Sequence, residues 1–202
     1  MTYLKEAFNP VTFEHAKNIV LTPDSQNSNK FEQETEFLID VIQHQNLITS
    51  NSMVLDFGCG MGRVSKELIN RLNCDVVGVD ISERMRIFAS LYITNPKKFQ
   101  TSDIIETNLF DMCLSILVLQ HSENPELEIR KIYDGLKENG ILVLVNEKHR
   151  LIPVGVDPQG YVIWYDDGVD VFDIVERYFT KLTEVPYKSN NKINITFYKK
   201  HV

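Results

Sequence analysis

One segment organises the chain: Met53-Val54-Leu55-Asp56-Phe57-Gly58-Cys59-Gly60-Met61-Gly62-Arg63. It reads as a short apolar strand, a glycine-rich turn and the start of a helix. Glycines at alternate positions let the backbone turn tightly and approach a ligand where a Cβ would collide. The following helix points its free N–H groups and the positive end of its dipole at whatever lies over the turn. This geometry suits a nucleotide-like cofactor at the carboxyl edge of a parallel sheet.

Composition indicates one domain with a sizeable core, because the chain has 202 residues and is 43% hydrophobic. Its net charge of −7 and the lack of a long Lys/Arg run disfavour nucleic acid as a partner. A small molecule or a basic partner fits this charge better.

The cysteines Cys59, Cys74 and Cys113 form neither a CxxC motif nor a Cys/His cluster, so we expect reduced thiols and no metal site. The first ten residues contain no apolar core of a signal peptide. The longest apolar runs, 116–119 and 141–145, are too short to span a bilayer. We therefore expect a soluble, cytoplasmic protein without a membrane partner.

Apolar periodicity and turn residues predict alternating strands and helices through residue 145. The expected helices cover 32–45, 64–72, 82–92, 124–139 and 171–178, and the expected strands cover 53–57, 75–79, 98–101, 110–118, 141–145, 181–187 and 193–199. Such alternation is typical of a three-layer α/β fold with right-handed crossovers. The loop between the last two strands is short, so that pair must be antiparallel. Residues 148–170 are expected to be the least regular part of the chain.

Asp80 follows the second expected strand, 22 residues after Gly58. A carboxylate at this place can accept two hydrogen bonds from a ribose diol. The alternative is a plain helix-capping acid, although Ser82 is already a good cap for the next helix. The glycines alone are weak evidence, because Gly58-x-Gly60-x-Gly62 departs from the dinucleotide pattern GxGxxG and also fits a purely structural turn.

Together, several segments resemble the class I S-adenosylmethionine-dependent methyltransferases. The resemblance lies in Val54–Gly62, Val76–Ser82, Phe99–Ile104, Phe110-Asp111 through Val118-Leu119-Gln120-His121, and Leu136–Leu142. It implies a Rossmann-like sandwich with a mostly parallel seven-stranded sheet and an antiparallel last strand. In a single methyltransferase domain, residues 1–48 would be an N-terminal cover and 49–147 the cofactor-binding core. Residues 148–170 would be a lid-like insertion, followed at 171–202 by a helix and a strand pair.

The same resemblance implies S-adenosylmethionine as cofactor and S-adenosylhomocysteine as product. The implied cofactor-binding residues are Asp56, Gly58, Gly60 and Gly62 for the methionine part, Asp80 for the ribose, Ile81 and Met85 beside the adenine, Asp103 and Ile104 at its edge and face, and Ser115 and Leu117 near the sulfonium.

His121 is the candidate general base because it follows the strand that borders the reaction centre. The alternative, which we favour, is that Leu119-Gln120-His121 only shapes the pocket. Glu147 could contact the acceptor, or it could merely cap the strand that precedes it. Trp164 and Tyr165, with Tyr161, could form an aromatic wall over the acceptor, or they could pack on the sheet as a lid. The carboxylates of Asp157, Asp166, Asp167, Asp170 and Asp173 could attract a cationic acceptor, although most such runs are solvated.

The sequence therefore predicts in-line methyl transfer from S-adenosylmethionine to an O- or N-nucleophile of a small molecule. One alternative is a catalytically silent module that binds the cofactor or its product. The other is a nicotinamide-dependent oxidoreductase, which the glycine spacing and the reversed last strand disfavour.

Overall fold

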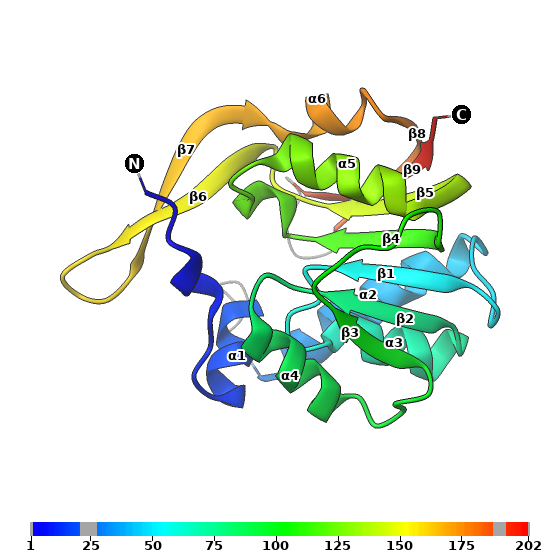
Figure 1. The fold of residues 1–202 in the computed structure, drawn as a ribbon, viewed down its shortest axis with the longest axis horizontal. Coiled ribbons are helices and arrows are strands. Elements are labelled where there is room, and N and C mark those ends of the chain that lie inside the picture. Colours follow the sequence, from blue (N-terminus) through cyan, green and yellow to red (C-terminus); the bar gives the residue numbers. More distant parts are fainter. Residues whose placement is uncertain (1, 21–27, 188–192, 202) are drawn as a thin grey trace.

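The computed structural model describes residues 2–20, 28–187 and 193–201, and only the backbone of residues 28–30. It contains a seven-stranded sheet in the order β3-β2-β1-β4-β5-β9-β8 (Figure 1). These strands are β1 Met53–Phe57, β2 Asp75–Val79, β3 Phe99–Ser102, β4 Phe110–Ile116, β5 Leu136–Val145, β8 Phe179–Pro186 and β9 Asn194–Lys200. The predicted α/β sheet is confirmed.

The glycine segment forms β1 and the turn that follows it at the centre of this sheet. β1 pairs in parallel with β2 on one side and β4 on the other, and Leu55 lies opposite both Val77 and Cys113. Because parallel strands end at the same edge, the residues after Phe57, Val79 and Ile116 come together. This carboxyl edge is where the candidate site lies.

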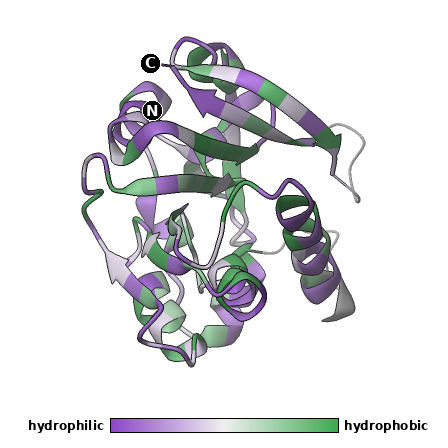
Figure 2. Ribbon diagram, turned by 90° about the vertical axis from the view of Figure 1, so that its right-hand side faces the viewer, coloured by the Kyte–Doolittle hydropathy of each residue, from purple (hydrophilic) through white to green (hydrophobic). Residues whose placement is uncertain are grey.

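Helices cover both faces of the sheet, and hydrophobic residues alternate with hydrophilic ones along them (Figure 2). One face packs against α2 Ser28–His44, α3 Arg63–Leu72 and α4 Glu83–Tyr92, and the other against α5 Pro125–Gly135 and α6 Val171–Val175. Val54 and Leu114 belong to the first core and Leu55 and Cys113 to the second, so successive strand residues face opposite layers. Both faces of the strands are buried, which explains their nearly continuous apolar sequence.

The reversed strand of the fold is β9. It pairs antiparallel with β5 and with β8, so it lies between them in the sheet. This confirms that the last strand is antiparallel. Among the described residues, no helix combines the length and apolar character that crossing a bilayer requires.

Some predicted boundaries are wrong. The helix expected to continue to Asn139 ends at Gly135, because Leu136 is buried and pairs with Phe110 as the first residue of β5. Sheet pairing there overrides the helical pattern of apolar residues. α2 begins at Ser28 rather than Glu32, and α6 ends at Val175 rather than Tyr178.

Residues 148–170, expected to be irregular, instead form an antiparallel hairpin of β6 His149–Val156 and β7 Val162–Asp170. The Asp157 carboxylate closes its turn by accepting the N–H groups of Gln159 and Tyr161. The hairpin extends away from the main sheet (Figure 1). The two prolines and three glycines of this segment favour irregular backbone, but strand pairing continues past Pro153 and Gly155 through a shift in register.

The N-terminal residues 3–20, which we call the N-terminal strap, run along the carboxyl edge. The strap contains the short helix η1 Lys5–Phe8 and α1 Phe13–Val20. The Leu4 N–H donates to the Pro153 carbonyl of β6, and Phe13 packs on Phe88 and Tyr92 of α4. The strap therefore connects the hairpin to α4 across the ends of the central strands.

Candidate cofactor site at the carboxyl edge

The glycine turn approaches its neighbours so closely that side chains would not fit. Gly58, Gly60 and Gly62 all have positive φ angles. A Cβ on Gly58 would lie 2.3 Å from Cγ2 of Val118, and one on Gly60 would lie 2.8 Å from Cγ1 of Val20 in the strap. The turn is thus a cradle of bare backbone between the end of β4 and the N-terminal strap.

Asp80 at the end of β2 is bound directly to this turn. Its Oδ2 accepts the Gly60 N–H at 2.9 Å, and its Oδ1 accepts the Ser82 N–H at 2.8 Å. Burial raises the pKa of the Asp80 carboxyl. Ser82 also caps α4 by accepting the Met85 N–H, as predicted, so Asp80 is not needed as the side-chain cap.

Asp56 is fully enclosed beneath the first turn of α3, where its carboxylate accepts a hydrogen bond from the Ser65 hydroxyl. Burial raises the pKa of Asp56 to about 6, and the nearby Asp80 carboxylate adds to the increase. Arg63 opposes it with its positive charge. Asp56 supports the turn from below, so contact between its side chain and a cofactor stays a prediction.

The residues expected around the adenine divide into two groups. Ile81 and Ile104 are 50% and 69% exposed at the ends of β2 and β3, and Asp103 is exposed beside them. Met85 instead is buried in a small core with Ala16 of the strap. Two exposed apolar side chains and a carboxylate suit an adenine ring, whereas Met85 supports the region from beneath.

The end of β4 carries the two residues expected near the sulfonium. Leu117 adopts a left-handed conformation with φ of 58°, which is strained for a leucine, and its N–H donates to the Val145 carbonyl at 2.6 Å. The Ser115 side chain is fully buried, and its hydroxyl has no hydrogen-bond partner among the described residues. The sharp bend at Leu117 directs the chain into the short helix η3 Leu119–His121.

A directional chain of hydrogen bonds fixes the ring of His121. The Glu147 N–H donates to Gln120 Oε1 at 2.6 Å, so the amide nitrogen of Gln120 faces His121 Nε2 at 3.1 Å. Nε2 therefore accepts, and Nδ1 carries the proton that it donates to the Leu151 carbonyl at 2.8 Å. Burial lowers the pKa of His121, which favours this neutral ring. Neither nitrogen is free to take a proton from an acceptor.

His121 also belongs to an aromatic cluster with Phe8 and Trp164. The ring centroids of His121 and Trp164 are 4.6 Å apart, and Phe8 lies 5.7 Å from His121. Tyr3 reaches the same place and donates its hydroxyl to the His121 carbonyl at 2.9 Å. Burial, with the carboxylates of Glu123 and Asp80, raises the pKa of Tyr3 to about 12. Asn9, the residue after Phe8, accepts a hydrogen bond from the Ser82 hydroxyl, so the strap carries this cluster beside the end of β2.

Trp164 is 43% exposed, so part of its ring is open to a ligand. Tyr165 pairs with Ile152 and, as the next residue in the strand, lies on the opposite face of the hairpin. Tyr161 is exposed just before β7. The structure thus brings Trp164 next to His121, whereas Tyr165 lies on the opposite face of the hairpin.

Most of the predicted acidic group has structural partners. Asp167 pairs with Arg150, Asp166 with His149, and Asp170 caps α6, in addition to the turn made by Asp157. These contacts argue against a shared role in attracting a cation. Glu147 is half-buried just after β5, and no described residue forms an ion pair with its carboxylate.

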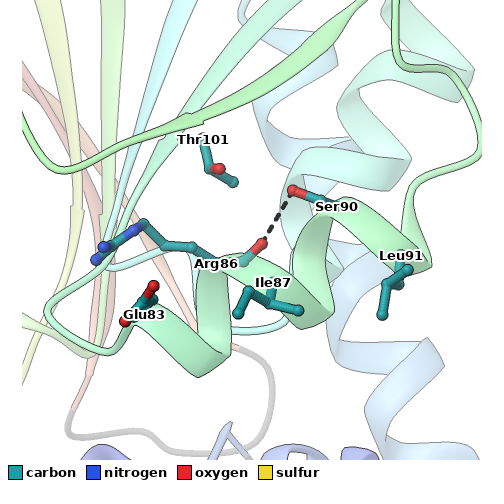
Figure 3. A pocket seen from close by; sticks show the side chains of 6 residues that line it. All are labelled: Glu83, Arg86, Ile87, Ser90, Leu91 and Thr101. Atoms are coloured by element: carbon teal, nitrogen blue, oxygen red, sulfur yellow. Dashed lines mark hydrogen bonds between the residues drawn. The ribbon is translucent and has the colours of Figure 1, made fainter.

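Two hollows lie beside the edge strand β3 rather than over the glycine turn. One, of about 330 Å³, is lined by Glu83, Arg86, Ile87, Ser90, Leu91 and Thr101 between α4 and β3 (Figure 3). The other, of about 160 Å³, includes Ile104. No residue predicted to bind the cofactor lines the first hollow.

Sequence reasoning missed Tyr3, Phe8, Val20 and Val118, which the structure places at the site. Tyr3 meets His121 across 118 positions of the chain. No local pattern signals such a contact. Val118 lay within the quoted segments, but its packing on Gly58 depends on the bend at Leu117.

Comparisons with known proteins show that this chain is similar to methyltransferases. Residues 55–144 match a family described as "Methyltransferase domain". The chain is 26% identical over 141 residues to (S)-coclaurine N-methyltransferase from Papaver somniferum, covering 65% of this chain and 40% of that protein. It is 32% identical over 112 residues to carboxy-S-adenosyl-L-methionine synthase from Shewanella piezotolerans, covering 50% and 46%. The chain therefore spans less than half the length of either relative.

Solved structures show the same fold. N-methyltransferase NodS from Bradyrhizobium japonicum, in complex with S-adenosyl-L-homocysteine, superposes with a TM-score of 0.64 at 16% identity, covering 93% of this chain and 97% of that chain. A protein from Pyrococcus horikoshii gives a TM-score of 0.68 at 22% identity, covering 92% and 99%.

Proposed function

We propose that the protein is a class I S-adenosylmethionine-dependent methyltransferase that transfers a methyl group from S-adenosylmethionine to a small molecule. The match of residues 55–144 to a family described as "Methyltransferase domain" supports this proposal. The observation that carries the proposal is the joint placement of the bare glycine cradle and the Asp80 carboxylate at the switch point of the sheet. Together they place backbone free of side chains next to a carboxylate that can bind a ribose.

In this proposal each predicted residue has a place along the cofactor. The backbone of Gly58, Gly60 and Gly62 holds the methionine part, Asp80 binds the ribose hydroxyls, and Ile81, Asp103 and Ile104 surround the adenine. Asp56 and Met85 support these groups from beneath. The bend at Leu117 presents the end of β4 to the sulfonium, and the buried Ser115 is part of the strand that supports this end.

The proposed acceptor site lies over Trp164 and Phe8, next to Tyr3 and the end of β5 with Glu147. A half-exposed aromatic surface beside the cofactor cradle suits a small organic molecule that stacks on it. (S)-coclaurine N-methyltransferase and NodS are named as N-methyltransferases, which is consistent with a nitrogen nucleophile here.

His121 is proposed to position the acceptor surface rather than to act as a base. Its two nitrogens hold Gln120 and the Leu151 carbonyl, and its ring supports Trp164. The cofactor supplies an activated methyl group when bound, so the protein's main tasks are alignment and exclusion of water. A nucleophile that need not lose a proton before it attacks, such as a neutral amine or a carboxylate, needs no base from the protein.

The test is transfer of labelled methyl groups from S-adenosylmethionine to a panel of small amines, phenols and carboxylates. We expect turnover with members of one class and none with Asp80→Ala. Trp164→Ala should raise KM for the acceptor with a smaller effect on kcat, and His121→Gln should leave the pH profile of kcat unchanged in shape. Tight binding of S-adenosylhomocysteine without transfer to any compound or extract would instead favour a silent binding module.

A further inference from the structure

The two edges of the seven-stranded sheet differ in how they are protected against pairing with another strand. β8 at one edge contains the ion pair of Lys181 with Glu184, its register with β9 shifts, and it ends at Pro186. Charges, bulges and prolines are the features with which natural sheets protect an edge. β3 at the other edge, 99–102, reads Phe-Gln-Thr-Ser and carries none of these features. The β3 edge is therefore suited to pairing with a further strand.

The ladder between β2 and β3 shows which backbone groups of this edge are free. The Val76 N–H donates to the Lys98 carbonyl at 2.8 Å, in a parallel register that pairs Val76 with Phe99. Backbone groups alternate in direction along a strand, so those of Gln100 face β2 whereas those of Phe99 and Thr101 face outward. Among the described residues, no strand other than β2 pairs with β3. Phe99 and Thr101 thus offer N–H and C=O groups to a neighbour.

An apolar stripe on α4 lies beside this free edge. Ile87 is 51% exposed and Leu91 is 74% exposed, and the two lie one helical turn apart. With Glu83 and Ser90 they line the hollow of about 330 Å³ between α4 and Thr101 of β3 (Figure 3). Exposed apolar side chains next to an unprotected strand edge are typical of a protein–protein interface.

Charged groups of opposite sign lie at the two ends of this surface. Glu83 begins α4 at the carboxyl end of the edge, the end where Asp103 follows β3. Lys97 is exposed at the amino end, just before β3. Lys98 pairs with Asp75, whereas no ion pair joins Glu83 or Lys97 to a described residue. A rotation that exchanges the two ends brings Lys97 of one copy of the chain to Glu83 of another.

We propose that two copies of the chain pair through β3 about a twofold axis, so that their sheets join into one. The same strand in two copies related by such an axis runs antiparallel. With the axis at Gln100, Phe99 of one copy lies opposite Thr101 of the other, and their outward N–H and C=O groups bond to each other. The rotation keeps both α4 helices on the same face of the joined sheet, where Ile87 and Leu91 pack across the axis.

A second copy meets three requirements of this surface together. It supplies a strand with the matching pattern of free backbone groups, an apolar stripe of the same size, and charges of opposite sign at each end. The interface consists of a strand of four residues and one side of a helix, so it is small. We therefore expect a reversible dimer with a dissociation constant on the order of 10 µM.

Sedimentation equilibrium of the full chain between about 1 and about 200 µM tests the dimer. The wild type should change from monomer to dimer over this range, and the amides of Phe99 and Thr101 should exchange hydrogen more slowly at the high end. Leu91→Arg should weaken association at least about tenfold, because it puts a charge into the apolar stripe. Thr101→Pro should weaken association by a similar factor, because it removes an outward N–H and leaves the bonds to β2 in place.

Leu182→Arg is the matched control, because Leu182 is a leucine that is 49% exposed on β8, the protected edge. It should leave the dissociation constant unchanged. A monomer at every concentration would overturn the proposal. So would a dimer that Leu91→Arg weakens no more than Leu182→Arg does.

An exchange of charges tests the twofold arrangement by rescue. Glu83→Lys and Lys97→Glu should each weaken association about threefold or more, because each places like charges across the axis. The double variant restores opposite charges and should bind itself about as tightly as the wild type. A double variant that associates as weakly as the two single variants would overturn the pairing of β3 across a twofold axis.

Discussion

Val118 lies so close to Gly58 that a Cβ added at residue 58 would come within 2.3 Å of one of its methyl groups. This contact joins the turn after β1 to the segment after β4. The segments that follow β1 and β4 are therefore packed against each other in the middle of the candidate site. This packing requires that residue 58 has no side chain.

Gly58→Ala should lower the free energy of unfolding by about 2–3 kcal/mol, because the clash with Val118 adds to a φ of 74° that alanine adopts with strain. The loss should be smaller in a Val118→Ala background, since only the backbone strain then remains. Urea denaturation of both single variants and the double variant measures this coupling. Additive effects would contradict the packing of Val118 on Gly58.

Asp56 should make stability depend on pH between about 4 and 6. Its pKa is raised from 3.8 to about 6, so the folded protein holds the proton more tightly than the unfolded chain does. That stabilisation is fully present below pH 3.8 and is lost as the pH rises through 6. Relative to Asp56→Asn, the wild type should lose up to about 3 kcal/mol over this interval. If the difference in unfolding free energy between the wild type and Asp56→Asn did not vary with pH, the raised pKa of Asp56 would be contradicted.

His121 should make stability depend on pH in the opposite direction, so that its contribution is lost as the pH falls. Its pKa is lowered in the folded state, so its contribution is present above pH 6.5 and is lost as the pH falls through the folded pKa. Protonation would place a proton on Nε2 against the Gln120 amide, in a ring that packs on Phe8 and Trp164. His121→Gln should therefore flatten the fall in stability below pH 6.5. His44→Gln, at an exposed histidine, is the control and should not flatten it. Equal slopes of stability against pH in the wild type, His121→Gln and His44→Gln would contradict the neutral ring assigned to His121.

Ser115→Ala should leave stability unchanged or raise it by up to about 1 kcal/mol. The Ser115 hydroxyl is fully buried without a partner among the described residues, so its removal ends a desolvation cost and leaves only a small void. Thermal and urea unfolding measure the effect. A loss of more than about 1 kcal/mol would show that the hydroxyl makes an interaction which its geometry does not reveal.

The central sheet was predictable because its signals are local. Residues of β1, β2 and β4 are buried on both faces and form apolar runs, and Ser82 caps α4 through its own neighbours. Asp80 could be placed at the carboxyl edge because the strand that precedes it ends there. The short loop before β9 was enough to predict its direction.

The rest depends on contacts that local patterns do not encode. Pro153 and Gly155 suggested irregular backbone, yet bulged pairing with β7 accommodates both. Leu136 fits a helical face, but pairing with Phe110 makes it part of β5. The aromatic cluster required Phe8, His121 and Trp164 to meet from three separate segments. His121 and Trp164 were candidates from the sequence and Phe8 was not, and no local pattern indicated that the three residues are neighbours.

The most direct test of the account is calorimetric titration of S-adenosylhomocysteine into the wild-type protein and into Asp80→Ala. Asp80 holds the Gly60 N–H and faces the expected ribose position, so its removal should affect both the cradle and the sugar contact. We predict saturable one-to-one binding to the wild type and a loss of affinity of at least about a hundredfold in the folded variant. Equal affinity of both proteins, or no binding to the wild type with a response to NADH instead, would contradict the account.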